Sequence, residues 1–331
     1  MLVRLFRGTT PGIVVLIVLI GLASWLGALT GKHESISSSG SVTGTMPLYY
    51  LLVDALGTNG FPGVFLSFLL VLLTGLLLVN FNTSIFFINE RTFLPSLFYF
   101  LLTGFFTSTQ SFNPVLPAAL LLMLAFWRIV DSYRKQETAY NFFDAAFLIG
   151  TSTLFYANMI WFAILPFIGI ALLRTGNIKE IFLALLGLLA PFTLVTGFYY
   201  VTGRDLMGLY ETFRGNLFNS IDAHSFTKLE IASLVLLGLM TLTGLVLLFS
   251  GMGNMKIKSR KTFSLLIWSF LISIVVYAAV PGASVEIVYI LILPLSYIFT
   301  YFFLFMKRKV VAEVAMWLLL AIIAIQQIMV L

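Results

Sequence analysis

The sequence predicts an all-α integral membrane protein, a transmembrane bundle of about 11 helices with its N-terminus in the cytoplasm. Three observations predict this fold. Of the 331 residues, 60% are hydrophobic and only 10% are charged, whereas a soluble domain carries about 25% charged residues. Apolar stretches of about 20 residues, the length that crosses a bilayer, recur along the whole chain. Threading the chain through a membrane also places most of its Lys and Arg residues on one side.

The first span is expected to be an uncleaved transmembrane helix. Arg4 and Arg7 precede an apolar run, as in a signal peptide, but this run is longer than the roughly 7–15 residues of a signal-peptide core. No convincing cleavage site follows it. The expected spans are 11–29, 61–80, 93–108, 115–130, 142–156, 158–173, 180–201, 229–250, 263–281, 286–306 and 312–330.

The orientation follows from where the basic residues fall when the sides alternate from span to span. Fifteen of the nineteen Lys and Arg residues then lie on the same side as the N-terminus. The acidic residues divide almost evenly, as expected when only positive charge sets the orientation. The positive side is therefore predicted to be cytoplasmic. The four basic residues of the outer side are Lys32, Arg204, Arg214 and Lys228.

Two outer segments are long enough to hold more than a turn. In the first, a proline followed by an apolar run predicts a short interfacial helix at about 46–58. In the second, apolar residues recur at helical spacing among charged ones, which predicts an amphipathic helix at about 203–222. Residues 1–331 are expected to form a single membrane domain. The residues singled out on the first interfacial helix are Pro47, Tyr49, Tyr50 and Asp54.

The composition excludes several classes of function. The chain has no Cys and only two His, so we expect no disulfide, no metal site and no Cys nucleophile. It has no P-loop, HExxH or GxSxG motif, and no cofactor is expected. The basic residues stand in short clusters at helix ends, which membrane topology explains, so nucleic acid is not an expected partner. The spans are nearly free of ionisable residues, which disfavours an ion-coupled transporter.

Chemistry is therefore expected on the outer surface. Glu34 is the only carboxylate between the first span and Pro47, and a carboxylate there could act as a general base beside a lipid-linked substrate. Basic residues of the outer side could hold the phosphate of the lipid carrier. The alternative is that all of them are solvated loop charges or anchors to lipid head groups. The basic residues considered for the phosphate are Lys32, Arg204, Arg214 and Lys228.

Two short motifs carry a family resemblance. Pro47-Leu48-Tyr49-Tyr50-Leu51-Leu52 follows the first outer loop, and a late outer turn leads into the Tyr-containing segment from Val285 to Pro294. This order of elements resembles the GT-C class of membrane glycosyltransferases, which take sugars from polyprenyl phosphates at the outer face. The class has one span, an outer loop with a catalytic acid, and then an interfacial helix. The chain also resembles uncharacterised polytopic membrane proteins of similar size.

The chain departs from the pattern of that class at two places. Its first outer loop lacks the Asp-containing acidic motif, so the resemblance implies that Glu34 takes the catalytic role. Just before Tyr289, where the class often has a basic residue for the lipid phosphate, the chain has Glu286 and two apolar residues. Either carrier binding has moved to residues such as Arg204 and Arg214, or catalysis has been lost.

Three functions remain open on the sequence. The first is a GT-C-like transferase that moves a sugar from a polyprenyl-phosphate carrier to an acceptor at the outer face of the cytoplasmic membrane. The second is a non-catalytic scaffold or complex subunit on the same architecture, whose partners are membrane lipid and other membrane proteins. The third, a transporter, is disfavoured by the apolar spans.

Overall fold

The structure, a computed structural model, describes residues 6, 8, 11–30, 45–57, 60–133, 139–174, 178–220 and 227–330. All regular structure within these residues is helical, as the sequence predicts, and comprises fourteen α-helices and four short 3₁₀ helices. The helices are α2 (Pro11–Ser24), α3 (Leu26–Leu29), α4 (Pro47–Leu56), α5 (Phe61–Ile85), α6 (Leu94–Gly104), η1 (Thr107–Thr109), α7 (Val115–Asp131), α8 (Ala139–Thr153), η2 (Ala157–Ala163), α9 (Ile164–Leu173), α10 (Ile178–Val201), α11 (Leu206–Phe218), α12 (Lys228–Gly251), η3 (Met252–Asn254), α13 (Ile257–Ala279), η4 (Val285–Ile287), α14 (Val288–Phe305) and α15 (Lys309–Val330).

The long helices have the length and composition of membrane spans. Six segments of the described chain are long and apolar enough to cross a membrane, and four shorter helical segments are also apolar. The chain therefore has the helices of a multi-pass membrane protein. The six long segments are Phe61–Ile85, Ile178–Val201, Lys228–Asn254, Ile257–Ala279, Val285–Phe305 and Lys309–Ile328.

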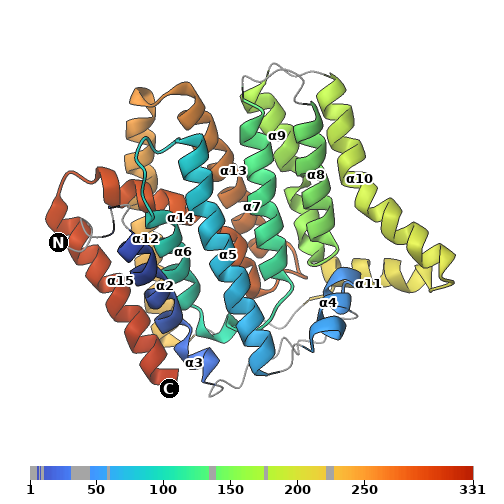
Figure 1. Ribbon diagram of the computed structural model, residues 1–331, viewed down its shortest axis with the longest axis horizontal. Coiled ribbons are helices and arrows are strands. Elements are labelled where there is room, and N and C mark those ends of the chain that lie inside the picture. Colours follow the sequence, from blue (N-terminus) through green and yellow to red (C-terminus); the bar gives the residue numbers. More distant parts are fainter. Residues whose placement is uncertain are drawn as a thin grey trace.

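Successive long helices run in opposite directions through the bundle (Figure 1). Both helices expected at the interface form, as α4 and α11, and both lie at the same end of the bundle, which we call the α4–α11 end. The C-terminal ends of α7 and α9 and the turn from α12 into α13 lie at the opposite end. This arrangement agrees with the alternating threading of the sequence, while the count of eleven spans and the cytoplasmic N-terminus stay predictions.

Two helices form the centre of the bundle. Every residue of α6 is buried, and so are fifteen residues of α14. The two helices interlock through Phe98, whose ring stacks on Phe303 at 4.7 Å and meets Phe299 edge-on at 5.9 Å. The hydroxyl of Tyr297 in α14 donates to the carbonyl of Leu78 in α5 at 2.7 Å. Aromatic packing and a buried hydrogen bond thus hold α5, α6 and α14 together.

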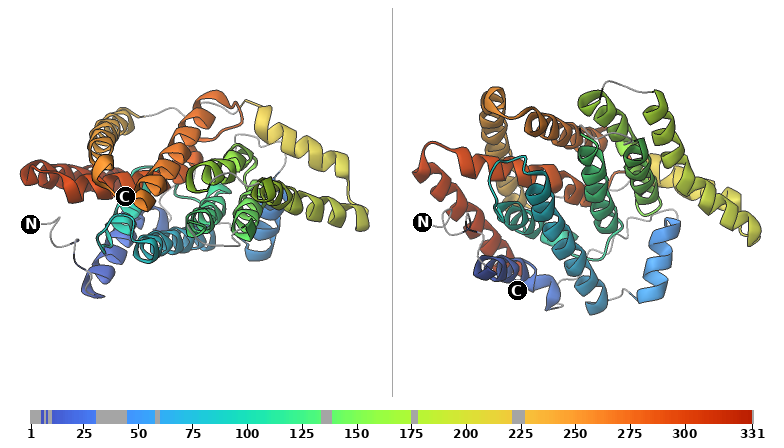
Figure 2. Two further views of the ribbon diagram at one scale, coloured as in Figure 1. Left: turned by 90° about the horizontal axis from the view of Figure 1, so that it is seen from above. Right: turned by 45° about the horizontal axis from the view of Figure 1, so that its top comes forward.

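A second layer is formed by α8 and α10, which approach each other closely at two glycines. A side chain at Gly187 of α10 would overlap the carbonyl of Phe143, and one at Gly150 of α8 would come within 2.8 Å of the carbonyl of Leu188. Small residues at these positions let the two backbones touch. Figure 2 shows that α10 and α11 project from one side of the bundle. The other face of α10 is exposed and apolar.

Some expected spans have different boundaries because polar side chains interrupt them. The first span breaks at Trp25, between α2 and α3. The carbonyl of Ser24, released by this break, accepts hydrogen bonds from the side-chain amides of Gln110 at 2.8 Å and Gln327 at 2.6 Å. The expected span 93–108 is similarly shorter, because α6 ends at Gly104 and a turn leads into η1. These interruptions are possible because the freed backbone groups find partners inside the protein.

Candidate functional site

A buried carboxylate lies at the α4–α11 end, where several connections meet. Glu286 of η4 is only 8% exposed, and its carboxylate accepts a hydrogen bond from the hydroxyl of Ser284 at 3.3 Å. The backbone N–H of Ser284 donates to the hydroxyl of Tyr156, between α8 and η2, at 3.3 Å. The connection from α13 to η4 is thereby fixed against the end of α8, and it holds the carboxylate in place.

Helix α4 supplies a second hydroxyl. Its N-terminus is attached to the end of α8 by a hydrogen bond from the N–H of Leu48 to the carbonyl of Leu154 at 3.2 Å. Tyr49 stacks on Phe112 at 5.4 Å and donates its hydroxyl proton to the carbonyl of that residue at 3.1 Å. Burial, and to a smaller extent the charge of Glu286, raise the pKa of Tyr49 to about 12. Tyr49 is therefore a neutral donor beside the carboxylate at neutral pH.

The side-chain amide of Asn158 is the last polar group that lies near Glu286. Asn158 of η2 is fully buried and donates to the carbonyl of Gly282 at 2.7 Å, while its side-chain oxygen has no hydrogen-bond partner. A buried polar atom without a partner is uncommon and costs stability. We call Tyr49, Tyr156, Asn158, Ser284 and Glu286 the Glu286 cluster.

Helices α4 and α11 meet over η2 beside this cluster. Met46 and Leu217 are buried against Ala157, and Tyr49 and Phe213 pack around them. The space between α4 and α11 at this point is therefore filled by apolar side chains. This small apolar cluster fixes the position of α11 and separates its exposed polar face from the Glu286 cluster.

The residues predicted to bind a phosphate lie apart from this carboxylate. Arg204, Arg214 and Lys228 are all exposed, and within the described chain no hydrogen bond or ion pair joins either arginine to the Glu286 cluster. Arg204 lies over the rings of Phe198 and Tyr199, with its guanidinium carbon 5.6 and 5.8 Å from their centroids. Such a position suits a side chain at the membrane interface. Glu34 and Lys32, the predicted base and its neighbour, lie outside the described residues.

Of the four residues singled out on the first interfacial helix, one reaches the site. Tyr49 is half-buried beside Glu286, whereas Tyr50 and Asp54 are exposed. Pro47 is buried and occupies the first position of α4, where its missing N–H costs nothing. The expected helix at 46–58 is confirmed with bounds of 47–56, and the one at 203–222 with bounds of 206–218.

The sequence motif around Tyr289 contains Glu286, but no pattern in the sequence connects this residue with Tyr49, Tyr156 or Asn158. A signal for its importance is present, since Glu286 is the single charged residue between Lys261 and Lys307. An ionisable residue in such an apolar stretch marks a functional site by default. Its partners come from two distant segments, however, and only the packing of the bundle brings them together.

The chemistry open to the Glu286 cluster is proton transfer. A carboxylate flanked by neutral hydroxyls and shielded from bulk water can accept a proton from a substrate hydroxyl. The described residues contain no group of three or more His, Asp or Glu side chains that could hold a metal ion.

The fold and this site together define a helical multi-pass membrane protein with a buried carboxylate at one end of its bundle. The chain belongs to a family of unknown function, DUF6427, whose profile matches residues 45–330. Comparison with curated proteins gives no match, and neither does comparison with solved structures. The family description names no activity, so function has to be argued from the site itself.

Proposed function

We propose that the protein is a GT-C-like transferase of the cytoplasmic membrane, acting at its outer face on a sugar carried by a polyprenyl phosphate. The observation that supports this proposal best is the buried Glu286 beside Tyr49 on an interfacial helix. A substrate anchored in the outer leaflet would present its head group at the depth of such a helix. The resemblance in the order of elements supports the same class.

The proposed reaction uses the carboxylate as a general base. An acceptor hydroxyl attacks the anomeric carbon of the sugar, the bond from that carbon to the phosphate oxygen breaks, and the carrier leaves as polyprenyl phosphate. Glu286 takes the proton of the acceptor hydroxyl. The hydroxyl oxygen of Tyr49, whose proton is donated to the carbonyl of Phe112, accepts a hydrogen bond from the substrate and orients it. The exposed Arg204 and Arg214 attract the carrier phosphate to the interface.

The test is transfer from undecaprenyl phosphate bearing a radiolabelled hexose, with the purified protein in liposomes. Glu286→Gln is expected to lower release of label into the aqueous phase by at least about a hundredfold, the usual contribution of a general base. Glu211→Gln removes a carboxylate from the exposed side of α11 and is the matched control. Glu34→Gln is measured alongside, because the sequence predicts Glu34 as the base.

Loss of activity in Glu34→Gln but not in Glu286→Gln would move the base to Glu34. Equal activity of all three variants would contradict the use of either carboxylate. If the wild-type protein releases no label from several hexose carriers, the transferase proposal fails.

The second candidate is a non-catalytic scaffold or complex subunit, and one observation favours it. The space between α4 and α11 is packed with apolar side chains, and Arg204 and Arg214 are exposed and not bonded to the Glu286 cluster. On this interpretation Glu286 fixes the connection before α14, and the exposed helices contact lipid or other membrane proteins. Glu286→Gln would then change thermal stability without any change in carrier binding.

The proposed topology has eleven spans, with the α4–α11 end outside. It can be tested by cysteine labelling, because the chain has no native Cys. An impermeant maleimide added to intact cells should label Arg214→Cys on the exposed face of α11. Lys256→Cys, between α12 and α13, should be labelled only after the membrane is opened. The reverse pattern would overturn the orientation.

A further inference from the structure

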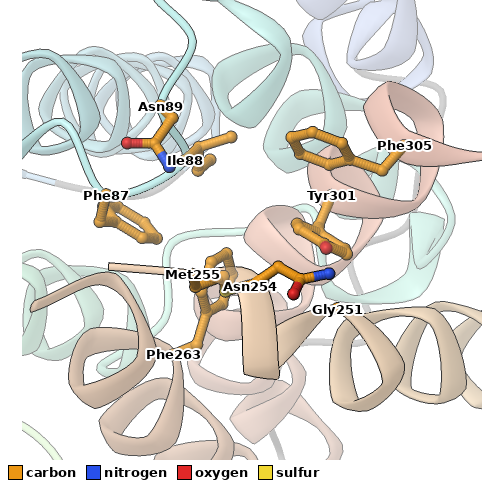
Figure 3. A pocket seen from close by; sticks show the side chains of 9 residues that line it. All are labelled: Phe87, Ile88, Asn89, Gly251, Asn254, Met255, Phe263, Tyr301 and Phe305. Carbon is orange, nitrogen blue, oxygen red and sulfur yellow. The ribbon is translucent and has the colours of Figure 1, made fainter. Parts of the chain in front are cut away.

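The end of the bundle opposite α4 and α11 contains a pocket of about 270 Å³. It lies where α5 ends, where α12 turns through η3 into α13, and where α14 ends. Figure 3 shows the side chains of these segments around the hollow, with Phe87 facing Tyr301 and Phe305 across it. The pocket lies far along the bundle from the Glu286 cluster and is independent of it.

The wall of this pocket is a continuous series of aromatic rings. Phe87 meets Phe263 edge-on at 5.0 Å, Phe263 meets Tyr301 at 5.6 Å, and Tyr301 lies 4.5 Å from Phe305. The polar groups of its lining are the amides of Asn89 and Asn254, both exposed, and the hydroxyl of Tyr301. The pocket thus combines an apolar interior with a polar rim, which is the composition of a site for an amphiphile.

One side of the pocket is preformed by a tightly held turn. Phe86 and Asn89 adopt left-handed backbone conformations, with φ of 55° and 63°. The fully buried Asn82 stabilises this turn, because its side-chain amide donates to the carbonyl of Glu90 at 3.0 Å and its oxygen accepts from the N–H of Ile88 at 3.4 Å. The position of Phe87 and Asn89 is therefore fixed before any ligand arrives.

Each of the three segments that line the pocket is followed within two residues by an exposed cation. Arg91 follows Asn89, Lys256 follows Met255, and Lys307 follows Phe305. The stretches 86–92, 251–262 and 306–311 together carry eight Lys and Arg residues and one acidic residue, Glu90. The surroundings of the pocket are therefore strongly positive.

We propose that this pocket binds an anionic phospholipid from the adjacent leaflet. One acyl chain enters between the aromatic rings, the amides of Asn89 and Asn254 bind the glycerol ester and phosphate oxygens, and the flanking cations neutralise the head group. Basic pockets between transmembrane helices on the cytoplasmic side select anionic head groups by the same means. A zwitterionic lipid with the same chains would gain the apolar contacts but not the charge.

The experiment is native mass spectrometry of the full chain in detergent with palmitoyl-oleoyl phosphatidylglycerol or the phosphatidylcholine of the same chains. Phosphatidylglycerol should be retained preferentially by the wild-type protein. Each basic residue near the lipid contributes about fivefold, so the double variant Lys256→Gln/Lys307→Gln should lose about thirtyfold in affinity. Asn254→Trp should abolish retention of both lipids by filling the hollow.

The control is Lys228→Gln, which removes an exposed cation at the α4–α11 end and should leave retention unchanged. Thermal unfolding of each variant checks its fold, and the exposed charge variants keep the test valid if Asn254→Trp does not fold. Equal retention of the two lipids by the wild-type protein would overturn the proposal. So would a preference that survives the charge variants, or displacement of phosphatidylglycerol by millimolar inorganic phosphate, which would indicate a site for a free anion.

Discussion

Helices α14 and α10 have the same mean hydropathy but occupy opposite kinds of environment. In the apolar stretch of α14, 89% of the residues are buried inside the protein, against 17% in α10. The difference follows from what the helices carry. In α14 the buried Tyr297 donates its hydroxyl proton to the carbonyl of Leu78 in α5. The hydroxyls of Thr193 and Thr196 in α10 donate only to carbonyls of their own helix. α10 instead exposes Leu194 and Phe198 on the face away from α8.

Hydropathy therefore identifies the helices that are suited to a membrane, but it does not show which of them face lipid. Within a bilayer, lipid tails are as apolar as a protein core, so burial is decided by packing and hydrogen bonding rather than by hydrophobicity. Identical substitutions at a closely packed position and at an exposed position can test this conclusion. The free energy of unfolding of each variant is measured in mixed detergent micelles.

The largest effect is expected for removal of a phenylalanine ring. Phe299→Ala in α14 would leave a cavity beside Phe98 and should cost about 3–5 kcal/mol. Phe182→Ala in α10, where the ring is 60% exposed, should stay within about 0.5 kcal/mol. Equal costs would mean that α10 is covered by a partner or by α10 of a second copy.

The next effect concerns the two glycines of α10. Gly187→Ala would place a methyl group against the carbonyl of Phe143 and should cost about 1–3 kcal/mol. Gly197→Ala, ten residues further along the same helix, meets no atom within 4 Å and should stabilise the helix by about 0.5–1 kcal/mol. A shared sign for the two changes would contradict the close approach of α8 and α10.

The smallest effect is expected for loss of one hydroxyl. Tyr297→Phe removes the hydrogen bond to Leu78 and should cost about 1 kcal/mol. Tyr200→Phe, at a residue of α10 that is 77% exposed, should produce no measurable change in unfolding. If the two variants are equally stable, the hydrogen bond between α14 and α5 does not contribute to the difference in burial between α14 and α10.

The helical fold class and the two helices α4 and α11 could be predicted from the sequence, while their place at the membrane interface stays a prediction. Long apolar runs, Pro47 at a helix start and the amphipathic spacing around Arg214 are local signals. Two features could not be predicted, because they depend on partners elsewhere in the chain. These are the break at Trp25 and the 3₁₀ helix η2, which forms the first part of the expected span 158–173. Gln110 and Gln327 reach the freed carbonyl of Ser24 only in the assembled bundle.

The candidate site could be predicted only in part. The two short sequence motifs contain Tyr49 and Glu286, and the structure places both residues at the same end of the bundle. The charge of Arg204 and Arg214 predicts that they bind a phosphate, yet both residues are exposed and apart from the carboxylate of Glu286. The charge of a residue shows that it can bind an anion. Whether Arg214 faces the site depends on which face of α11 packs on η2, and the sequence does not specify this.

Gln327 in the last helix has a consequence for the order in which the bundle assembles. Gln327 accepts from the N–H of Gly27 at 3.2 Å and donates to the carbonyl of Ser24 at 2.6 Å, so it joins segments 300 residues apart. A ribosome releases α2 and α3 long before it has translated α15. Gln110, which is translated earlier, can already donate to the carbonyl of Ser24. Until α15 arrives, however, the N–H of Gly27 must be hydrated or bonded to the insertion machinery. Closure of the bundle is therefore a late, post-insertion event, completed only once the far end of the chain has entered the membrane.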